Sequence, residues 1–340
     1  MRRGRKNDGR RVFIACAGLL AAPVVAWLGI SAHAQGAGQD WEKAAGGKQE
    51  FEVASVRRDT TDGGSYSNFS LDGGNLYFTV DKTYKQNPEG SLFSAKNLPL
   101  LRYIVFAYKL AGTQELALRF DFYAGLGLHV PDWVRNDRYD IEARAAEPAT
   151  KDQMRLMMQS LLADRFKLAA HWEARQAPVF ALVLEKPGVL GPQLRPHAAS
   201  DDCGKAVAPD RASKTATAAA QQLGALPIPC GMIAHLPASA VGAHRFGGRD
   251  VPLAMLAESM PAQTGLVTLP RPVIDRTGLD GGYDFWMEWT LEDTSEMNAA
   301  AITGGTFREA LKNQLGLKLE AQKGPVKVLV IDHVEQPGEN

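Results

Sequence analysis

The order of local sequence features repeats within the chain, and this repetition constrains the fold more than any single motif. Asn97 opens an Asn-x-Pro-Leu motif, and Asp250 opens the matching Asp-x-Pro-Leu. Both motifs predict a helix start, because proline is tolerated in the first helical turn. Further along each half, a Tyr-Asp pair opens a strand of alternating apolar and polar residues, at Tyr139 and at Tyr283. The shared order predicts two copies of one folding unit.

A capping box predicts a second helix in each copy. In this motif a Thr side chain accepts from an early backbone amide, and a Gln or Glu three residues later reaches back. The pairs are Thr150 with Gln153 and Thr306 with Glu309. Apolar residues at helical spacing follow both pairs. Gly316 is placed to end the later helix, since glycine tolerates left-handed backbone.

Two strands are predicted after each capped helix. Phe166–Leu168 and Leu317–Leu319 alternate apolar with polar residues and are expected to start short strands. Val179–Leu184 and Val326–Ile331 are almost unbroken apolar runs, typical of separate strands that are covered on both faces.

These elements predict an α+β fold of two similar split βαβ-type modules, each with two helices on a small mixed sheet. The first repeat is expected at residues 51–186 and the second at 250–340, after a flexible lead at 35–50. Residues 187–249 are rich in Ala, Pro and Gly and have weak periodicity. They are expected to form a long, partly irregular linker, since a segment of this length is usually a linker or a functional loop.

Residues 1–34 have the pattern of an export signal. A basic stretch precedes nineteen largely apolar residues, Val12–Ile30, and Ala32-His33-Ala34 fits cleavage before Gln35. An uncleaved anchor is the alternative, since about 20 apolar residues can span a bilayer. Either interpretation places the body in the periplasm or outside the cell, with membrane contact only through this segment if it is uncleaved.

The charge distribution excludes one class of partner. Residues 1–34 hold six basic side chains and one acidic one, which gives +5, and the whole chain has a formal net charge of zero. The remainder therefore carries −5. Broad nucleic-acid binding needs a basic face, so we expect no nucleic-acid partner.

The cysteines predict one disulfide. Cys16 lies in the export signal, which leaves Cys203 and Cys230. In an oxidising compartment such a pair is expected to form a bridge, worth about 3–4 kcal/mol on the chain-entropy model. Two free thiols are the alternative. A zinc site would need further ligands, and none lies at the usual short spacing, so no metal and no cofactor are predicted.

No catalytic residue is predicted from motifs. The chain lacks Gly-x-Ser-x-Gly, and Gly278–Gly282 lacks the strand–loop–helix context of a phosphate loop. His171 and Glu173 place two potential ligands on one strand face, but one pair is not a metal site.

Asp284, Trp286 and Glu288 are the candidate binding face, because alternate residues of a strand share a face. We call these three residues the acidic face. Asp284 and Glu288 would lie about 13 Å apart along the backbone, farther than the paired carboxylates of glycosidases. The favoured interpretation is a solvated acidic surface with one exposed Trp. A site for a sugar or a cationic peptide, or a hydrolytic site, remains open.

Several stretches resemble one known family. They are "FEVASVR" from Phe51, "RYDIEARA" from Arg138, "RPVIDRTGLDGGYDF" from Arg271 and the run ending at Asn340. They look like a soil-associated family of exported proteins of unknown function. Its domain is duplicated and in some relatives is fused to an antirepressor-type membrane metallopeptidase. This chain has no His-Glu-x-x-His, so the resemblance implies export and no catalytic residues. The repeat unit also resembles the secretin and TonB N-terminal domain.

The sequence as a whole predicts an exported, non-catalytic binding or interaction module of the bacterial envelope. Its partner would be an envelope protein, a peptide or a glycan. Exposed sheet edges could accept a strand of the partner. A groove between the repeats, with residues 187–249 as a lid, is a second mechanism. The alternative function is an envelope hydrolase of glycans or peptides that uses acidic residues on the Tyr283–Glu292 strand.

Overall fold

The computed structural model describes residues 40–74, 77–78, 84–85, 90–110, 112–121, 123–201, 203, 226–264, 269–290 and 305–338. Contacts divide the chain after Asp40, and the unit that starts at Trp41 contains all the sheets. The expected export signal at 1–34 lies outside the described residues. Within the described ranges, no helix is long and apolar enough to cross a membrane.

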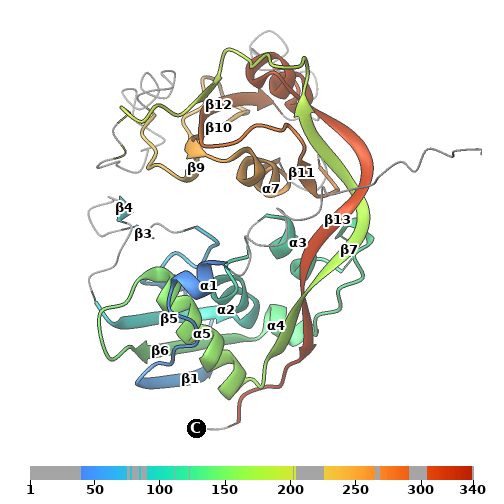
Figure 1. The fold of residues 1–340 in the computed structure, drawn as a ribbon. Coiled ribbons are helices and arrows are strands. Elements are labelled where there is room, and N and C mark those ends of the chain that lie inside the picture. The colour runs from blue at the N-terminus through green and yellow to red at the C-terminus, as the bar shows by residue number, and fades with distance from the viewer. Residues whose placement is uncertain are drawn as a thin grey trace, which may run out of the picture. The chain divides into compact units, whose positions relative to one another are not determined.

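The first sheet is antiparallel and has the order β1-β6-β5-β2, and Figure 1 shows β1, β6 and β5 side by side. Its strands are β1 (Val53–Asp59), β2 (Tyr66–Ser67), β5 (Leu92–Pro99) and β6 (Arg138–Arg144). Helices α2 (Leu100–Ala107) and α5 (Lys151–Arg165) contact each other and share one apolar core with the sheet. Smaller elements are α1 (Asp40–Ala44), β3 (Tyr77–Phe78), β4 (Tyr84–Lys85), α3 (Thr113–Arg119), η1 (Tyr123–Gly125) and α4 (Asp132–Asn136).

The second sheet is also antiparallel, with the order β8-β12-β10-β9. Its strands are β8 (Leu194–Pro196), β9 (Met232–Leu236), β10 (Ala243–Val251) and β12 (Tyr283–Thr290). Helices α7 (Leu253–Thr264) and α8 (Phe307–Ala310), with the π-helical turn η3 (Leu311–Leu315), pack on a separate core. Gly316 ends this turn in left-handed backbone, as the sequence predicted.

A third sheet is built on two long antiparallel strands, β7 (Ala169–Leu184) and β13 (Leu317–His333) (Figure 1). The short strand β11 (Val273–Asp275) runs parallel to β7 on its other side. The prediction of separate short strands here is wrong, because each capped helix is followed by one continuous strand. Ala177 and Val326 belong to the first core, whereas Leu182 and Leu317 belong to the second.

The repeated motifs adopt the same local geometry in both sheets. Both capping boxes are formed, at Thr150 and at Thr306. Asn97 (φ 53°) and Asp250 (φ 51°) both have left-handed backbone at a register shift. Asn and Asp are the residues that tolerate this conformation best after glycine. Each donates its backbone N–H to the Asp of the Tyr-Asp pair: Asn97 to Asp140 at 2.9 Å and Asp250 to Asp284 at 3.0 Å.

The described residues of 187–249 contain strands that were not expected there. They supply β8, β9 and most of β10, so the expected boundary at 250 falls inside a strand. The strand pattern was weak because β10 carries Gly247 and Gly248, and glycine is a poor strand former. Close packing requires both glycines. A Cβ on Gly247 would lie 2.8 Å from Leu236, and a Cβ on Gly248 would lie 2.5 Å from the ring of Phe285.

Candidate functional site

The acidic face of β12 is an interior surface. Asp284 is 0% exposed and Glu288 is 5% exposed, while Trp286 is half-buried. The expected solvated surface is therefore wrong. Residues from 187–249 cover it: Leu226 and Ile228 belong to a small apolar cluster that packs against Trp286.

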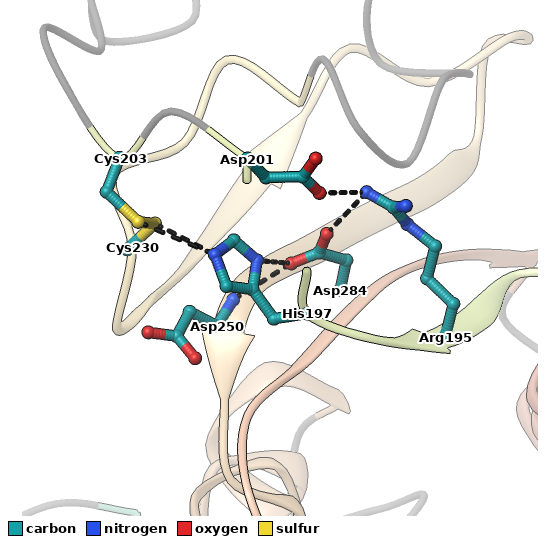
Figure 2. The surroundings of a disulfide bond; sticks show 7 residues. All are labelled: Arg195, His197, Asp201, Cys203, Cys230, Asp250 and Asp284. Carbon is teal, nitrogen blue, oxygen red and sulfur yellow. Dashed lines mark hydrogen bonds and ion pairs between the residues drawn. A yellow bond between two sulfur atoms is a disulfide. The ribbon is translucent and has the colours of Figure 1, made fainter. Parts of the chain in front are cut away.

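Asp284 uses both of its carboxylate oxygens in buried contacts (Figure 2). Arg195, the residue opposite Asp284 on β8, binds Oδ2 through Nη2 at 2.9 Å. His197 Nδ1 lies 2.7 Å from Oδ1, and the backbone N–H of Asp250 donates to the same oxygen at 3.0 Å. Arg195 also pairs with Asp201. The Asp284 carboxylate therefore holds three segments together.

The Glu288 carboxylate also has ion-pair and hydrogen-bond partners on both oxygens, but from different residues. Arg245 lies opposite Glu288 on β10, and its Nε is 2.6 Å from Oε2. Ser239 donates its backbone N–H to Oε2 at 2.9 Å and its hydroxyl to Oε1. The Arg245 guanidinium lies 4.9 Å from the ring centroid of Trp286, in cation–π contact. A general base or nucleophile needs an oxygen that can reach substrate, and both carboxylates of the acidic face are used in these contacts.

The predicted disulfide between Cys203 and Cys230 is present, with a Cα–Cα distance of 5.3 Å. His197 connects it to the acidic face, because its Nε2 lies 3.6 Å from the sulfur of Cys203 and 3.9 Å from that of Cys230. The donor atoms of His197, both cysteines and Asp250 all lie within 4.8 Å of one another. These four residues come from three segments that are distant in the sequence, so no ligand spacing in the sequence indicates the cluster.

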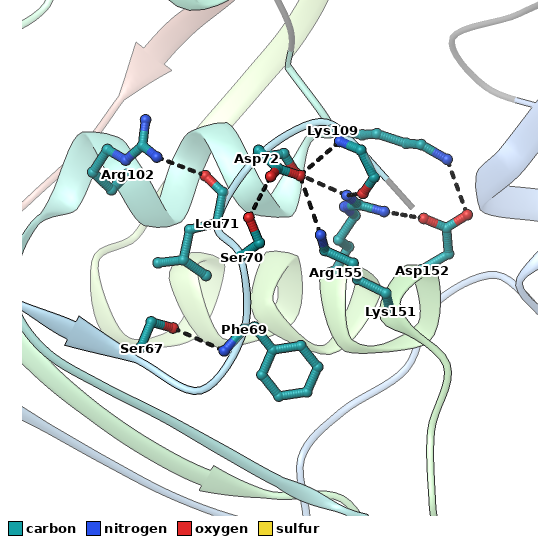
Figure 3. Close-up of polar contacts among 11 residues, drawn as sticks. Ser67, Phe69, Ser70, Leu71, Asp72, Arg102, Lys109, Lys151, Asp152 and Arg155 are labelled. Atoms are coloured by element: carbon teal, nitrogen blue, oxygen red, sulfur yellow. Dashed lines mark hydrogen bonds and ion pairs between the residues drawn. The ribbon is translucent and has the colours of Figure 1, made fainter. Parts of the chain in front are cut away.

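A second buried polar cluster ties the segment after β2 to α5 (Figure 3). Arg155 is fully buried and donates to the backbone oxygen of Asp72 at 2.8 Å, while Lys151 Nζ lies 3.1 Å from the Asp72 carboxylate. Lys109 pairs with Asp152 at 3.0 Å. Burial lowers the pKa of Lys151 to about 8 and also lowers the pKa of Lys109. The sequence showed no signal for this cluster, because Asp72 lies 79 residues from Lys151 along the chain.

A surface groove lies by the first sheet. Its volume is about 510 Å³, and it is lined by residues of the lead into β1, of β1 itself and of the C-terminal part of α5, including Phe51, Ala54, Ser160 and Leu161. Its lining includes charged side chains, among them Lys48 and Glu50, which form an exposed ion pair at 2.8 Å. None of its lining residues belongs to the acidic face or to the disulfide.

Comparison with known proteins identifies a family. A family model described as a protein of unknown function (DUF3738) covers residues 102–334, from α2 to the end of β13. This range includes the acidic face, the disulfide and both capping boxes. No curated protein and no solved structure matches the chain. Since the match covers most of the sequence, the chain belongs to the DUF3738 family of proteins of unknown function.

Proposed function

We propose that the chain is an exported, non-catalytic binding module of the bacterial envelope that accepts an extended segment of a partner protein along the outer edge of β13. The observation that carries this proposal is the sheet order β11-β7-β13. Among the described residues, the 17-residue strand β13 pairs with one strand, β7, from Leu317 to His333 with one register shift. A strand edge of this length presents a row of backbone donors and acceptors for pairing.

The direction of these backbone groups follows from one hydrogen bond. Glu185 donates its N–H to the carbonyl of Gly316 at 2.8 Å, which makes this a hydrogen-bonded pair in line with the β7–β13 register. In an antiparallel ladder such pairs alternate with pairs whose N–H and C=O point away from the partner. Leu319, Ala321 and Lys323 therefore point their backbone groups outward. We call these three residues the outer edge of β13.

Two prolines of the ribbon and the outward N–H of Phe180 on β7 fit this alternation of inward and outward backbone groups. Pro325 and Pro178 occupy outward-pointing pairs, where a missing N–H costs no ladder bond. On β7, Phe180 faces Ala321 and donates its N–H outward to Pro272 at 2.8 Å. That contact is a strand-like pairing of the kind we propose for the opposite edge of the ribbon.

Exposure identifies the accessible part of the edge. All four side chains from Glu320 to Lys323 are exposed, whereas Gly324 and Val326 are buried. Pro325 offers no outward donor, so a docked strand would pair chiefly before it. In strand addition, backbone hydrogen bonds supply affinity and alternate side chains supply specificity. The expected partner is thus an extended peptide segment of an envelope protein.

We also propose that the two sheets arose by duplication. They have corresponding strand orders, β1-β6-β5-β2 and β8-β12-β10-β9. In both, a left-handed Asn or Asp precedes the first helix, and its N–H donates to the Asp of a Tyr-Asp pair. Each copy would then contribute one strand of the β7–β13 ribbon, so the copies are interlocked rather than joined by a linker.

The alternative of an envelope hydrolase has less support. It requires free carboxylates on β12, and Asp284 and Glu288 are both held in buried ion pairs. Screening wild-type protein and the double variant Asp284→Asn/Glu288→Gln on polysaccharides and peptides tests it. Turnover by the wild type that disappears in a folded double variant would favour the hydrolase and overturn our proposal.

Ala321→Pro tests the binding proposal directly. This substitution removes the outward N–H of residue 321 and keeps every hydrogen bond between β13 and β7. Pro325 shows that the strand accommodates proline at an outward position. Ala321→Ser is the matched control because it keeps the N–H. In native-envelope crosslinking with mass spectrometry, partners should be captured by wild type and Ala321→Ser and lost in Ala321→Pro, with unchanged unfolding midpoints. Equal capture by all three proteins would refute docking at this edge.

A further inference from the structure

We propose that His197, Cys203, Cys230 and Asp250 form a zinc site when the disulfide is reduced. Their donor atoms already lie within 4.8 Å of one another. Tetrahedral zinc with ligands at about 2.0–2.3 Å requires neighbouring donor atoms to be about 3.3–3.8 Å apart. The His197 nitrogen lies 3.6 Å from one sulfur, within this spacing, and 3.9 Å from the other, just beyond it. The two sulfurs, which are bonded in the disulfide, must separate to this spacing.

The surroundings of His197 match those of a metal-binding histidine. Its Nδ1 lies 2.7 Å from the fully buried carboxylate of Asp284 (Figure 2). Neutral imidazole donates from one nitrogen and accepts at the other, so donation to Asp284 leaves the Nε2 lone pair directed at the sulfurs. Metal-ligating histidines almost always donate their second N–H to such a group. Arg195 in turn holds Asp284 in place.

Asp250 completes the donor set with a hard oxygen ligand. Its left-handed backbone is fixed by the hydrogen bond from its N–H to Asp284. Gly282 leaves room for its side chain, since a Cβ at Gly282 would lie 1.8 Å from Asp250 Oδ1. Two thiolates, one imidazole and one carboxylate make a closed four-ligand set of the kind that zinc prefers.

The chemistry balances with a dithiol as reductant. The dithiol transfers two electrons and two protons to the disulfide, giving two protein thiols, and is itself oxidised to a disulfide. Zinc binding then releases the two thiol protons, because the thiolate is the ligand. Coordination by zinc would thereby keep the Cys203 segment connected to Cys230, just before β9, under reducing conditions. The two segments would thus be joined by the disulfide in the oxidised protein and by zinc in the reduced protein.

Metal binding by the full chain tests this inference. The protein is reduced with dithiothreitol, freed of reductant without oxygen, and titrated with zinc, and bound metal is measured by mass spectrometry. Cobalt gives an independent readout, because tetrahedral thiolate coordination produces intense visible absorption bands. We expect about one metal per reduced chain and none in the oxidised protein. Circular dichroism monitors the fold throughout.

Four variants sharpen the result. His197→Ala should abolish stoichiometric binding, and Asp250→Asn should weaken it while keeping the left-handed backbone and its N–H. Asp284→Asn should weaken binding by about 10–100-fold, because Asp284 positions His197 and the backbone of Asp250. His244→Ala, on β10, is the control and should bind normally. Absence of binding by the reduced wild type, folded or unfolded, or full binding by His197→Ala, would overturn the proposal.

Discussion

The buried carboxylate of Asp284 allows a quantitative prediction. Asp284→Ala removes the partner of Arg195, of His197 and of the Asp250 N–H at once. Removing one member of a buried ion pair typically costs about 3–5 kcal/mol, because the remaining polar groups stay desolvated. Arg195 is 35% exposed and keeps Asp201, so water relieves part of its cost. We therefore expect a loss of about 3 kcal/mol, mostly from His197 and the Asp250 amide.

Asp140 is the matched control in the other sheet. It accepts the Asn97 N–H at 2.9 Å, as Asp284 accepts that of Asp250, but it is only half-buried. Water can replace much of what Asp140→Ala removes, so the expected loss is about 1 kcal/mol. The difference between the two losses of unfolding free energy therefore reports how much more the burial of Asp284 contributes to stability.

Urea unfolding of the oxidised proteins at pH 7, followed by circular dichroism, gives both values, provided that the slopes agree. Asp284→Ala should lower the free energy of unfolding about 2 kcal/mol more than Asp140→Ala does. Equal losses, or a loss below about 1 kcal/mol for Asp284→Ala, would refute the conclusion that the acidic face is interior.

Three further predictions concern other sites. Burial raises the pKa of Glu258 from 4.5 to about 7, so stability should fall as pH rises through this range. Glu258→Gln should remove this pH dependence. In urea unfolding, the variant's free energy of unfolding should exceed that of the wild type by up to about 3 kcal/mol at pH 8.5 and by little at pH 4.5. Gly112→Ala should cost about 2–3 kcal/mol, because its Cβ would lie 1.8 Å from the Glu258 carbonyl; a neutral effect would contradict this packing. Cys203→Ser/Cys230→Ser should lower the free energy of unfolding by about 3–4 kcal/mol relative to the oxidised wild type. An unchanged melting temperature would show that the bridge does not stabilise the fold.

Local features of the fold could be predicted from the sequence. The capping boxes at Thr150 and Thr306 and the helix end at Gly316 depend on nearby residues, and the structure confirms all three. The disulfide was also predictable, because Cys203 and Cys230 are the two cysteines that follow the expected signal.

Features set by distant contacts could not be predicted. Strict alternation on β12 is the same for a solvated face and for a buried paired one, and the partners distinguish them, among them His197 and Ser239. These partners come from a segment with little periodicity. The long ribbon was missed because Pro178 and Pro325 suggest strand breaks, and their outward position becomes clear only from the register.

Residue-resolved amide hydrogen exchange, followed by NMR, tests the proposed docking edge most directly. In the free protein, the outward amides of Leu319, Ala321 and Lys323 should exchange at least about 100-fold faster than those of Glu320 and Gln322, which face β7. The edge of β13 would then be open to a partner strand. Equal protection of both sets would contradict the account, because the outer edge would already be paired.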